Sequence, residues 1–466
     1  MKEAECGQMT IFLSLMLISF FLIISVCIEG VYVQTEKADF MEQQLLMGEY
    51  AQANYHKELA EQFHVFAIDS RYVSKMNASL KAKLEQNMNG SLKAFQISDQ
   101  TDITDQDGEI LKHQIREYMK YEETSNLLEQ IKNSFRGVED DGDVKQLKST
   151  IQNIGEEESE KDAEEEKETV KAEDPRKGLN RLLKKDILDL VMPNGKRISD
   201  REISITYGTR DKKKEMKPDF FQKDTVLELF DDSSKKTALN QLSSEGLGVL
   251  YAAEFFRNAV DQTQADGIQY EMEYLISGKS SDRDNLKSVV HQLLAIRFAL
   301  NYSYLLSDSA KQAEAYTLAA AIANIGASIP GVVEGIKLLL LAAWSYGESI
   351  IDVRSLLKGN KIPLVKTEAE WQLSLSNLAT LTANEGGSKK GNTYEDYLKI
   401  LLFLKLEPKE KYLRMMDMME QRIQEKQSDF QLSESIFSYK MMVKKEIPSL
   451  FYGTCYQVEN SRIYAY

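Results

Sequence analysis

The chain has 466 residues, of which 58 are basic and 73 acidic, so its formal net charge is −15. Because binding to phosphates needs concentrated lysine and arginine, this charge argues against nucleic acid as a partner. The chain's three cysteines are too few and too widely spaced for a disulfide framework. The length allows two or three domains, and the 42% hydrophobic content is enough for a sizeable core.

The first segment is an apolar run from Gln8 to Ile28 that holds no charged side chain. An α-helix rises 1.5 Å per residue, so about 20 apolar residues span the roughly 30 Å hydrocarbon core of a bilayer. We therefore predict a cytoplasmic tail over residues 1–7 and a transmembrane anchor over residues 8–30. The anchor side chains expected to face lipid are Phe12, Leu13, Leu17, Phe20, Phe21 and Ile24. Three serines interrupt the run, and their hydroxyls can bond within a helix.

Two alternatives exist for this end of the chain. A cleaved signal peptide needs a shorter apolar region and an A-x-A-like site, which the stretch from Val26 to Gly30 does not match. Lipidation of Cys27 would need a small residue before it, and Val26 is not one. The flanking charges say little about orientation, but a short tail before the span is typical of an anchor with its N-terminus inside. We therefore expect residues 30–466 to lie outside the cell.

Residues 31–137 are predicted to form a membrane-proximal helical region. Up to about residue 68, apolar residues recur at helical spacing and predict a stalk continuous with the anchor. Residues 72–136 are also helix-biased, with a turn at Asp105–Gly108. That turn faintly resembles a calcium loop, but Gln114 stands where the EF-hand pattern needs a glutamate, so no metal is expected.

Residues 138–177 are expected to be an acidic, disordered linker. From Glu156 to Asp174, eleven acidic residues face three lysines, which gives this stretch a charge of −8. With almost no apolar residues, such a stretch cannot offset its conformational entropy by burial. An acidic docking segment for a basic partner is the functional alternative.

Residues 178–466 are predicted to be a distal helical domain with a small antiparallel sheet. Residues 202–207 and 268–276 alternate in polarity and predict strands, the second with Glu271 and Glu273 on its polar face. Near the C-terminus, extended segments flank Glu459–Ser461 and predict a hairpin there.

Helical periodicity is stronger than the strand signals in this domain. Apolar residues recur at helical spacing over 249–260 and again over 286–300, which predicts two core helices. The overall fold class is therefore mostly α with a small antiparallel sheet, an α+β fold. Residues 318–347 are a candidate second membrane span, but Glu334 and Lys337 interrupt them, and each charge at mid-bilayer would cost about 2.5–3.5 kcal/mol. We expect a buried helical hairpin there instead.

Several motifs stand out in the distal domain. They run through residues 273–279 and 348–354 and include Gly278, Lys279, Asp282, Asn285, Trp344, Glu348, Asp352, Arg354, Lys366 and Trp371. Together these motifs resemble a family of unknown function encoded in tight-adherence (Tad/Flp) pilus loci of Gram-positive bacteria. The anchor resembles the same family over Gly7–Leu15 and at Glu29. The resemblance covers the anchor and most of residues 200–466, and leaves out the acidic linker.

The resemblance implies a pseudopilin-like membrane component of a pilus machine. Pilins of such systems are cut after a glycine and use a glutamate five residues into the mature chain. Here cleavage after Gly7 would place Phe12 at that position. A permanently anchored chain is therefore the favoured interpretation.

Sequence patterns for enzymatic chemistry are weak. The chain has four histidines, no H-E-x-x-H or G-x-S-x-G motif, and no phosphate-loop or dinucleotide fingerprint, so no cofactor is expected. Glu348 and Asp352, four residues apart on a predicted helix, are candidates for an acid and base pair, but with Arg354 nearby such a pair more often belongs to a structural ion-pair network, which is the favoured interpretation.

The sequence therefore predicts a non-enzymatic, single-pass membrane protein of the cell envelope. Its expected partners are the lipid bilayer and other membrane proteins of the pilus locus. The alternatives are a stand-alone extracellular binding module, such as an adhesin or ligand sensor, and an uncharacterised hydrolase that uses Glu348 and Asp352.

Overall fold

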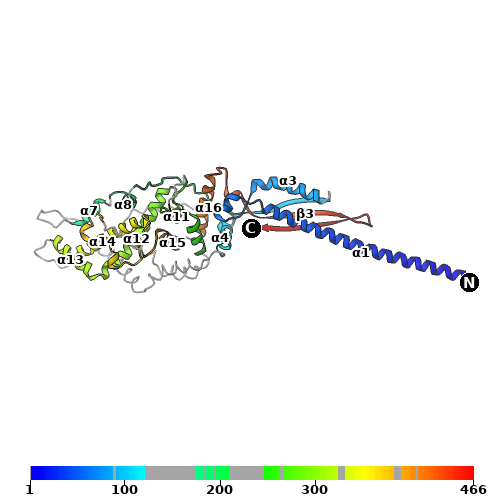
Figure 1. Cartoon of the computed structure of the whole chain (residues 1–466), viewed down its shortest axis with the longest axis horizontal. Coiled ribbons are helices and arrows are strands. Elements are labelled where there is room, and N and C mark those ends of the chain that lie inside the picture. The colour runs from blue at the N-terminus through cyan, green and yellow to red at the C-terminus, as the bar shows by residue number, and fades with distance from the viewer. Residues whose placement is uncertain are drawn as a thin grey trace. The chain divides into compact units, whose positions relative to one another are not determined.

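The computed structural model describes residues 2–87, 91–120, 174–182, 184–193, 195–208, 246–261, 267–323, 331–382, 390–405 and 408–466. The chain divides into two compact units (Figure 1). Unit 1 comprises Met1–Gln114 and Gln427–Tyr466, and unit 2 comprises Ile115–Lys426. Unit 2 is therefore inserted into the sequence of unit 1. The acidic linker lies outside the described residues up to residue 173.

Unit 1 combines helices with a four-stranded antiparallel sheet, so the predicted α+β class is confirmed. Its elements are α1 (Lys2–Gln52), α2 (Lys57–Phe63), β1 (Ile68–Asp69), α3 (Ser70–Asn87), β2 (Leu92–Asp102), η1 (Asp105–Gly108), η4 (Leu432–Glu434), β3 (Ser435–Pro448) and β4 (Cys455–Ala465). The helix α4 (Glu109–Met119) contains the boundary between the two units.

Unit 2 is helical in its described residues, apart from isolated bridges at Glu202 and Ile362. It begins its described part with α7 (Pro175–Leu182), α8 (Ile187–Val191) and a helix over Gly246–Phe255. The elements that follow are α11 (Glu271–Ser277), α12 (Asp282–Ser307), α13 (Ser309–Ala323), α14 (Val332–Leu357), η2 (Glu368–Glu370), η3 (Leu375–Asn377), α15 (Tyr394–Lys405) and α16 (Pro408–Gln424).

The helix α1 joins the predicted anchor to the first part of the predicted stalk without a break, but it ends at Gln52, short of the predicted end near residue 68. Within the apolar run, the hydroxyls of Ser14, Ser19 and Ser25 donate to carbonyls three or four residues earlier, at 2.8–2.9 Å, so these polar groups are satisfied inside the helix. Among the described residues, α1 is the one helix long and apolar enough to cross a membrane. Its length and composition fit a membrane anchor or a signal sequence.

The strand β3 is the centre of the sheet of unit 1. It pairs antiparallel with β1, β2 and β4. Tyr439, Met441 and Val443 alternate along β3 and turn to one face, where they share a core with side chains from α1 and α3, including Phe40 and Leu80. The two helices therefore cover one face of the sheet, as expected for a strand that alternates apolar and polar residues.

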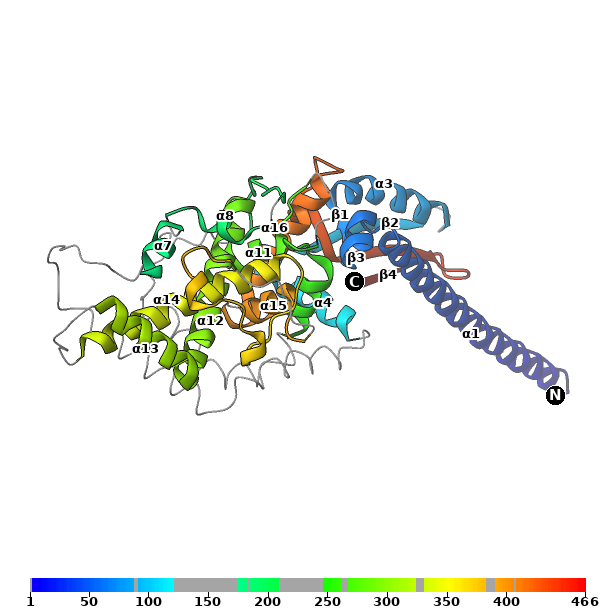
Figure 2. The ribbon, with the colours of Figure 1, turned by 60° about the vertical axis from the view of Figure 1, so that its left-hand side comes forward.

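The β3–β4 hairpin lies along the second half of α1 (Figures 1 and 2). At the far end of α1, the Gln52 amide donates to the Ala465 carbonyl at 2.8 Å. One turn earlier, the ring of Tyr464 fills the space beside Gly48, and the Tyr439 hydroxyl donates to the Gly48 carbonyl at 3.1 Å. Further along the helix, Lys445 bonds to Glu36 at 2.7 Å. The last strand pair of the chain is thus docked on its first helix.

In unit 2, α12 and α14 form the central helix pair, and the predicted core stripe over 286–300 lies buried in α12. The predicted helix over 249–260 is present as Gly246–Phe255. The predicted hairpin over 318–347 corresponds to α13 packed on α14. It is less buried than expected, because in α13 only Ala315 and Ala319 are buried.

Three strand predictions are wrong. Residues 268–276 hold the helix α11, in which all seven residues are buried, so alternation there does not separate a core face from a solvent face. Residues 202–207 contribute a single bridge, Glu202 with Ser281. The predicted hairpin at Glu459–Ser461 is instead the middle of the continuous strand β4, and the reversal occurs at Ser449–Thr454.

The region predicted as helical over 72–136 also contains a strand. Residues Leu92–Asp102 form β2, which pairs with β3, a segment more than 300 positions away in sequence. This pairing, not local preference, decides the structure of residues 92–102. The predicted turn at Asp105–Gly108 is confirmed, with Gln106 and Asp107 in the left-handed region.

We expect Gly48→Ala to destabilise unit 1 by about 1–3 kcal/mol, because over-packing the contact with Tyr464 outweighs the gain in helix propensity. A Cβ at position 48 would lie 1.9 Å from Tyr464 Cε1. The matched control is Gly30→Ala in the same helix, where a Cβ would meet no atom within 4 Å. Hydrogen exchange of the detergent-solubilised chain, read by mass spectrometry, should show faster exchange in β3 and β4 for Gly48→Ala only. Equal exchange in the two variants would refute the close contact.

Candidate functional site

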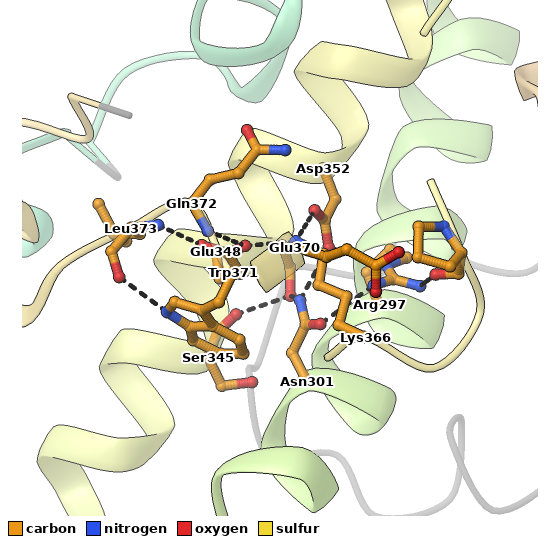
Figure 3. Close-up of polar contacts among 12 residues, drawn as sticks. Arg297, Asn301, Ser345, Glu348, Asp352, Lys366, Glu370, Trp371, Gln372 and Leu373 are labelled. Atoms are coloured by element: carbon orange, nitrogen blue, oxygen red, sulfur yellow. Dashed lines mark hydrogen bonds and ion pairs between the residues drawn. The ribbon is translucent and has the colours of Figure 1, made fainter. Parts of the chain in front are cut away.

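Of the motif residues singled out in the sequence, Trp344, Glu348 and Asp352 lie on one face of α14. They are spaced four residues apart, so each lies about one helical turn from the next. Lys366 and Trp371, from the segment between α14 and α15, lie against this face (Figure 3). The structure therefore brings five of the ten predicted positions together in one buried cluster.

Asp352 lies next to both cations of this cluster, Arg297 and Lys366. Its Oδ2 accepts from Arg297 Nε and from Asn301 Nδ2, both at 2.9 Å. Its Oδ1 makes no hydrogen bond of good geometry but forms an ion pair with Lys366 Nζ. The side chains of Asp352 and Arg297 are completely buried.

Arg297 connects α12 to the segment that follows α14. Its Nη1 donates to the carbonyls of Pro363 and Leu364 at 2.8 and 2.9 Å, and to the Tyr397 hydroxyl at 3.0 Å. Its Nη2 donates to Asn301 Oδ1 at 3.1 Å. One guanidinium thereby bonds to groups from four separate parts of unit 2.

Glu348 fixes the other end of the same segment. Its carboxylate accepts from the backbone N–H groups of Gln372 and Leu373 at 3.0 and 2.7 Å, and it also accepts from Lys366 Nζ. The Leu373 carbonyl in turn accepts from the indole N–H groups of Trp344 and Trp371, each at 2.7 Å. Both tryptophans are therefore held by the backbone that Glu348 holds.

The cluster pairs two cations, Arg297 and Lys366, with two anions, Glu348 and Asp352, so it is neutral overall. Burial raises the pKa of Glu348, and the charge of Lys366 only partly offsets this. Burial would also raise the pKa of Asp352, but the charges of Arg297 and Lys366 and the hydrogen bond from Asn301 hold that pKa below its ordinary value. All four side chains are at most 1% exposed, so neither acid faces solvent where a substrate proton would be. This arrangement is suited to holding the segment from Pro363 to Leu373 in place.

Arg354 does not join this network. Its guanidinium donates to the Leu190 carbonyl at 2.8 and 3.0 Å and to the Leu381 carbonyl at 3.3 Å. The cationic partners of the acids are instead Lys366 and Arg297, and Arg297 is a residue that the sequence analysis missed. A signal for it exists, since Arg297 interrupts the apolar stripe of residues 286–300 at a position where a charge must be partnered to be buried.

Gly278, Lys279, Asp282 and Asn285 form a second group, at the turn between α11 and α12. Asn285 Oδ1 accepts from the Lys279 N–H at 2.8 Å, and its amide donates to the carbonyls of Lys279 and Ser281. Asp282 accepts from the Ser199 hydroxyl at 2.5 Å and from the Gln269 N–H at 3.1 Å. Gly278 ends α11 at a φ of 61°, and a Cβ there would lie 2.5 Å from the Arg414 guanidinium carbon. These residues shape the turn.

Two glutamates of α11 are buried rather than exposed as predicted. Glu271 forms an ion pair with Arg422 and accepts from the Arg257 N–H at 2.7 Å. Glu273 Oε1 accepts from the Ala259 N–H at 2.8 Å and the Tyr394 hydroxyl at 2.7 Å, while its Oε2 has no hydrogen-bond partner. Burial raises the pKa of Glu273 to about 7, and the hydrogen bonds from Tyr394 and Ala259 offset this only in part.

Within the described residues, no three histidine, cysteine, aspartate or glutamate side chains are grouped to hold a metal ion. His56 and His64 flank the short helix α2. His56 Nδ1 accepts from the Leu59 N–H at 3.2 Å, and His64 ends the helix in the left-handed conformation. Both histidines therefore have a local structural role.

We expect Arg297→Met to destabilise unit 2 by about 3–5 kcal/mol, since it leaves Asp352 buried without its guanidinium partner. The control is Lys337→Met, which removes the partner of the half-exposed Glu334 and should cost less than about 1 kcal/mol. Urea unfolding can be followed by the fluorescence of Trp344 and Trp371, the chain's two tryptophans. Equal midpoints for the two variants would contradict a structural role for the cluster.

We expect Glu273 to make unit 2 less stable as the pH rises. The folded state holds the Glu273 proton more tightly than the unfolded state, so the proton contributes to the free energy of unfolding. This contribution is complete below about pH 4.5 and is lost as the pH rises through about 7. The difference amounts to at most about 3 kcal/mol. Glu273→Gln should remove this part of the pH dependence between pH 5 and 8 in the same fluorescence assay. If variant and parent lose stability in parallel, Glu273 is not a neutral acid in the folded chain.

Comparison with known proteins places a family match over most of unit 2. DUF5702, described as a family of unknown function, matches residues 165–447. The match includes both groups of motif residues described above, starts inside the acidic segment, leaves out the anchor and ends within β3. Part of the acidic segment therefore belongs to the family region, contrary to expectation. No curated protein and no solved structure matches the chain.

Proposed function

We propose that this chain, which belongs to DUF5702, a family of unknown function, is a non-enzymatic, membrane-anchored component of a tight-adherence (Tad/Flp) pilus or a related cell-envelope apparatus. Its role is structural or in assembly. In this proposal α1 crosses the cell membrane once, the bulk of the chain lies outside the cell, and the partners are other membrane proteins encoded in the same locus.

The observation that carries the proposal is the change in the surroundings of α1 at Glu29. Over residues 9–23, before this change, every residue of the helix is exposed, with Phe12 at 68% and Leu17 at 56%. From Glu29 onward its side chains pack against the sheet of unit 1, beginning with the buried Glu29 itself. An uncovered apolar surface of this length is unfavourable in water and is suited to lipid or to the anchors of partner proteins.

The buried cluster of unit 2 supports a non-enzymatic role. Glu348 and Asp352, the two carboxylates that the sequence offered as an acid and base pair, are sealed from solvent and bonded to Lys366. Their contacts hold the segment from Pro363 to Leu373 against α12 and α14. In the proposal this rigid unit presents a surface to partners and carries out no reaction.

A candidate partner surface on unit 2 is the outer side of α13. Its exposed residues include Ala313, Tyr316, Ala320 and Ala321. Small side chains let a second helix approach closely, and an exposed tyrosine contributes a large contact area at little entropic cost. We therefore infer that α13 takes part in docking another helical protein.

The proposal is tested by photo-crosslinking in intact cells. A photoreactive phenylalanine analogue replaces Tyr316 in one strain and the exposed Lys358 in a control strain. After irradiation, the full chain is purified and its crosslinked partners are identified by mass spectrometry. We expect membrane proteins of the pilus locus to be captured from position 316 and not from position 358. Recovery of the chain alone from both positions, where known membrane complexes survive, would refute the assembly role and favour a stand-alone extracellular binding module.

A further inference from the structure

The loop that closes the terminal hairpin is unusually apolar for an exposed turn. Residues 447–458 contain no charged side chain, although 28% of the whole chain is charged. At the tip, Leu450, Phe451 and Tyr452 are 52%, 53% and 44% exposed. Three adjacent large side chains on a turn of a water-soluble surface would be unfavourable, so their exposure needs an explanation.

The loop has a defined structure. The Ser449 N–H donates to the Thr454 carbonyl at 2.8 Å, the Tyr452 N–H donates to the Ser449 hydroxyl at 2.6 Å, and Gly453 adopts a φ of 60°. These bonds satisfy backbone groups inside the turn. The apolar side chains therefore point outward from a folded loop.

The loop lies beside α1 where the apolar run ends. The Leu450 N–H donates to the Glu29 carboxylate, at 3.0 and 3.3 Å to its two oxygens. The hydroxyls of Tyr452 and Ser25 are 3.2 Å apart. Since Ser25 is three residues before the end of the run at Ile28, Tyr452 lies about 5 Å inside that end along the helix axis.

The hairpin has little freedom to move along α1. Its contacts run from Ser25 to Gln52, which is about 40 Å of helix at 1.5 Å per residue. The strand β3 and its loop, from Ser438 to Leu450, extend by about the same length at roughly 3.3 Å per residue. Because Lys445 and Glu36 also bond midway, the position of the loop relative to the apolar run is fixed.

We propose that the Ser449–Thr454 loop is a second membrane contact, in which Leu450 and Phe451 enter the outer edge of the lipid bilayer beside α1. Tyr452 lies there at the level of the headgroups, where tyrosine is favoured because its ring is apolar and its hydroxyl is polar. The inference rests on the proposed function, since it requires α1 to cross the membrane. Together, α1 and the loop would limit the depth and tilt of unit 1 at the membrane, whereas a single spanning helix would leave its tilt free.

The experiment measures the depth of three positions in the full chain. Cys6, Cys27 and Cys455 are replaced by serine, and a nitroxide spin label is attached to single cysteines introduced as Phe451→Cys, Ile463→Cys or Ile18→Cys. Ile463 is an exposed residue of β4, about 26 Å from the loop end of that strand at roughly 3.3 Å per residue. Ile18 lies in the apolar run. The chain is reconstituted into phosphatidylcholine and phosphatidylglycerol vesicles, and each label's collision with oxygen, which concentrates in lipid, is compared with its collision with a water-soluble nickel chelate.

We expect the oxygen-to-nickel ratio at position 451 to be several-fold higher than at position 463 and lower than at position 18. If position 18 is in lipid while position 451 behaves like position 463, the loop is in water, and the inference is overturned with the anchor intact. If position 451 is shielded from both reagents, protein covers the loop, which also overturns the inference. If position 18 itself behaves like position 463, the proposed membrane anchor and the proposed loop contact are both refuted.

Discussion

The structure of unit 1 depends on the docking of the C-terminal hairpin against α1. Gln44 shows how closely the two are matched, because its side chain donates to the Met441 carbonyl at 3.0 Å and accepts from the Asn460 amide at 2.7 Å. One turn later, Gly48 leaves room for Tyr464, whose ring stacks on Tyr439 with centroids 5.5 Å apart. Without the hairpin, β2 would lose its partner strand, and the apolar face of α1 around Phe40 would lose much of its cover.

This dependence has a consequence for folding. The first and last parts of the chain must meet before the sheet can form, and the whole of unit 2 lies between them in sequence. Contacts over such a sequence separation form late, because the entropy of closing the loop is lost before the contacts are gained. Unit 2 is one continuous segment of the chain with its own internal contacts, so it can fold before the hairpin has been synthesised.

Unit 2 is held by buried polar groups as much as by its apolar core. Taking Arg297, Lys366, Glu348 and Asp352 out of water is costly, and their mutual attraction offsets that cost only because nearly every donor and acceptor is used. Such contacts are directional, so they select one position for the segment from Pro363 to Leu373. Under the proposed function, that fixed position gives partner proteins a constant surface, while α1 and the hairpin loop hold unit 1 at the membrane.

Features that arise from composition and local periodicity could be predicted before the fold was known. An uncharged run of membrane length predicts α1, and apolar residues at helical spacing predict α12, because both signals lie within one segment. The spacing of Glu348 and Asp352 likewise places them on one helix face, and it allowed two interpretations, a structural ion-pair network or a catalytic acid and base pair. Here sequence was sufficient because the helix forms its own hydrogen bonds.

The secondary structure and burial of residues that depend on a distant partner could not be predicted in this way. Residues 92–102 are a strand because β3 pairs with them, and Glu271 and Glu273 are buried in a helix because Arg422 and Tyr394 reach them from elsewhere in the chain. The strand β3 itself was not predicted, and its three partner strands come from distant parts of the chain. Arg297 took the role expected of Arg354 for the same reason: a charge can be buried only where the fold brings its counterion, and sequence spacing along one helix does not contain that distance.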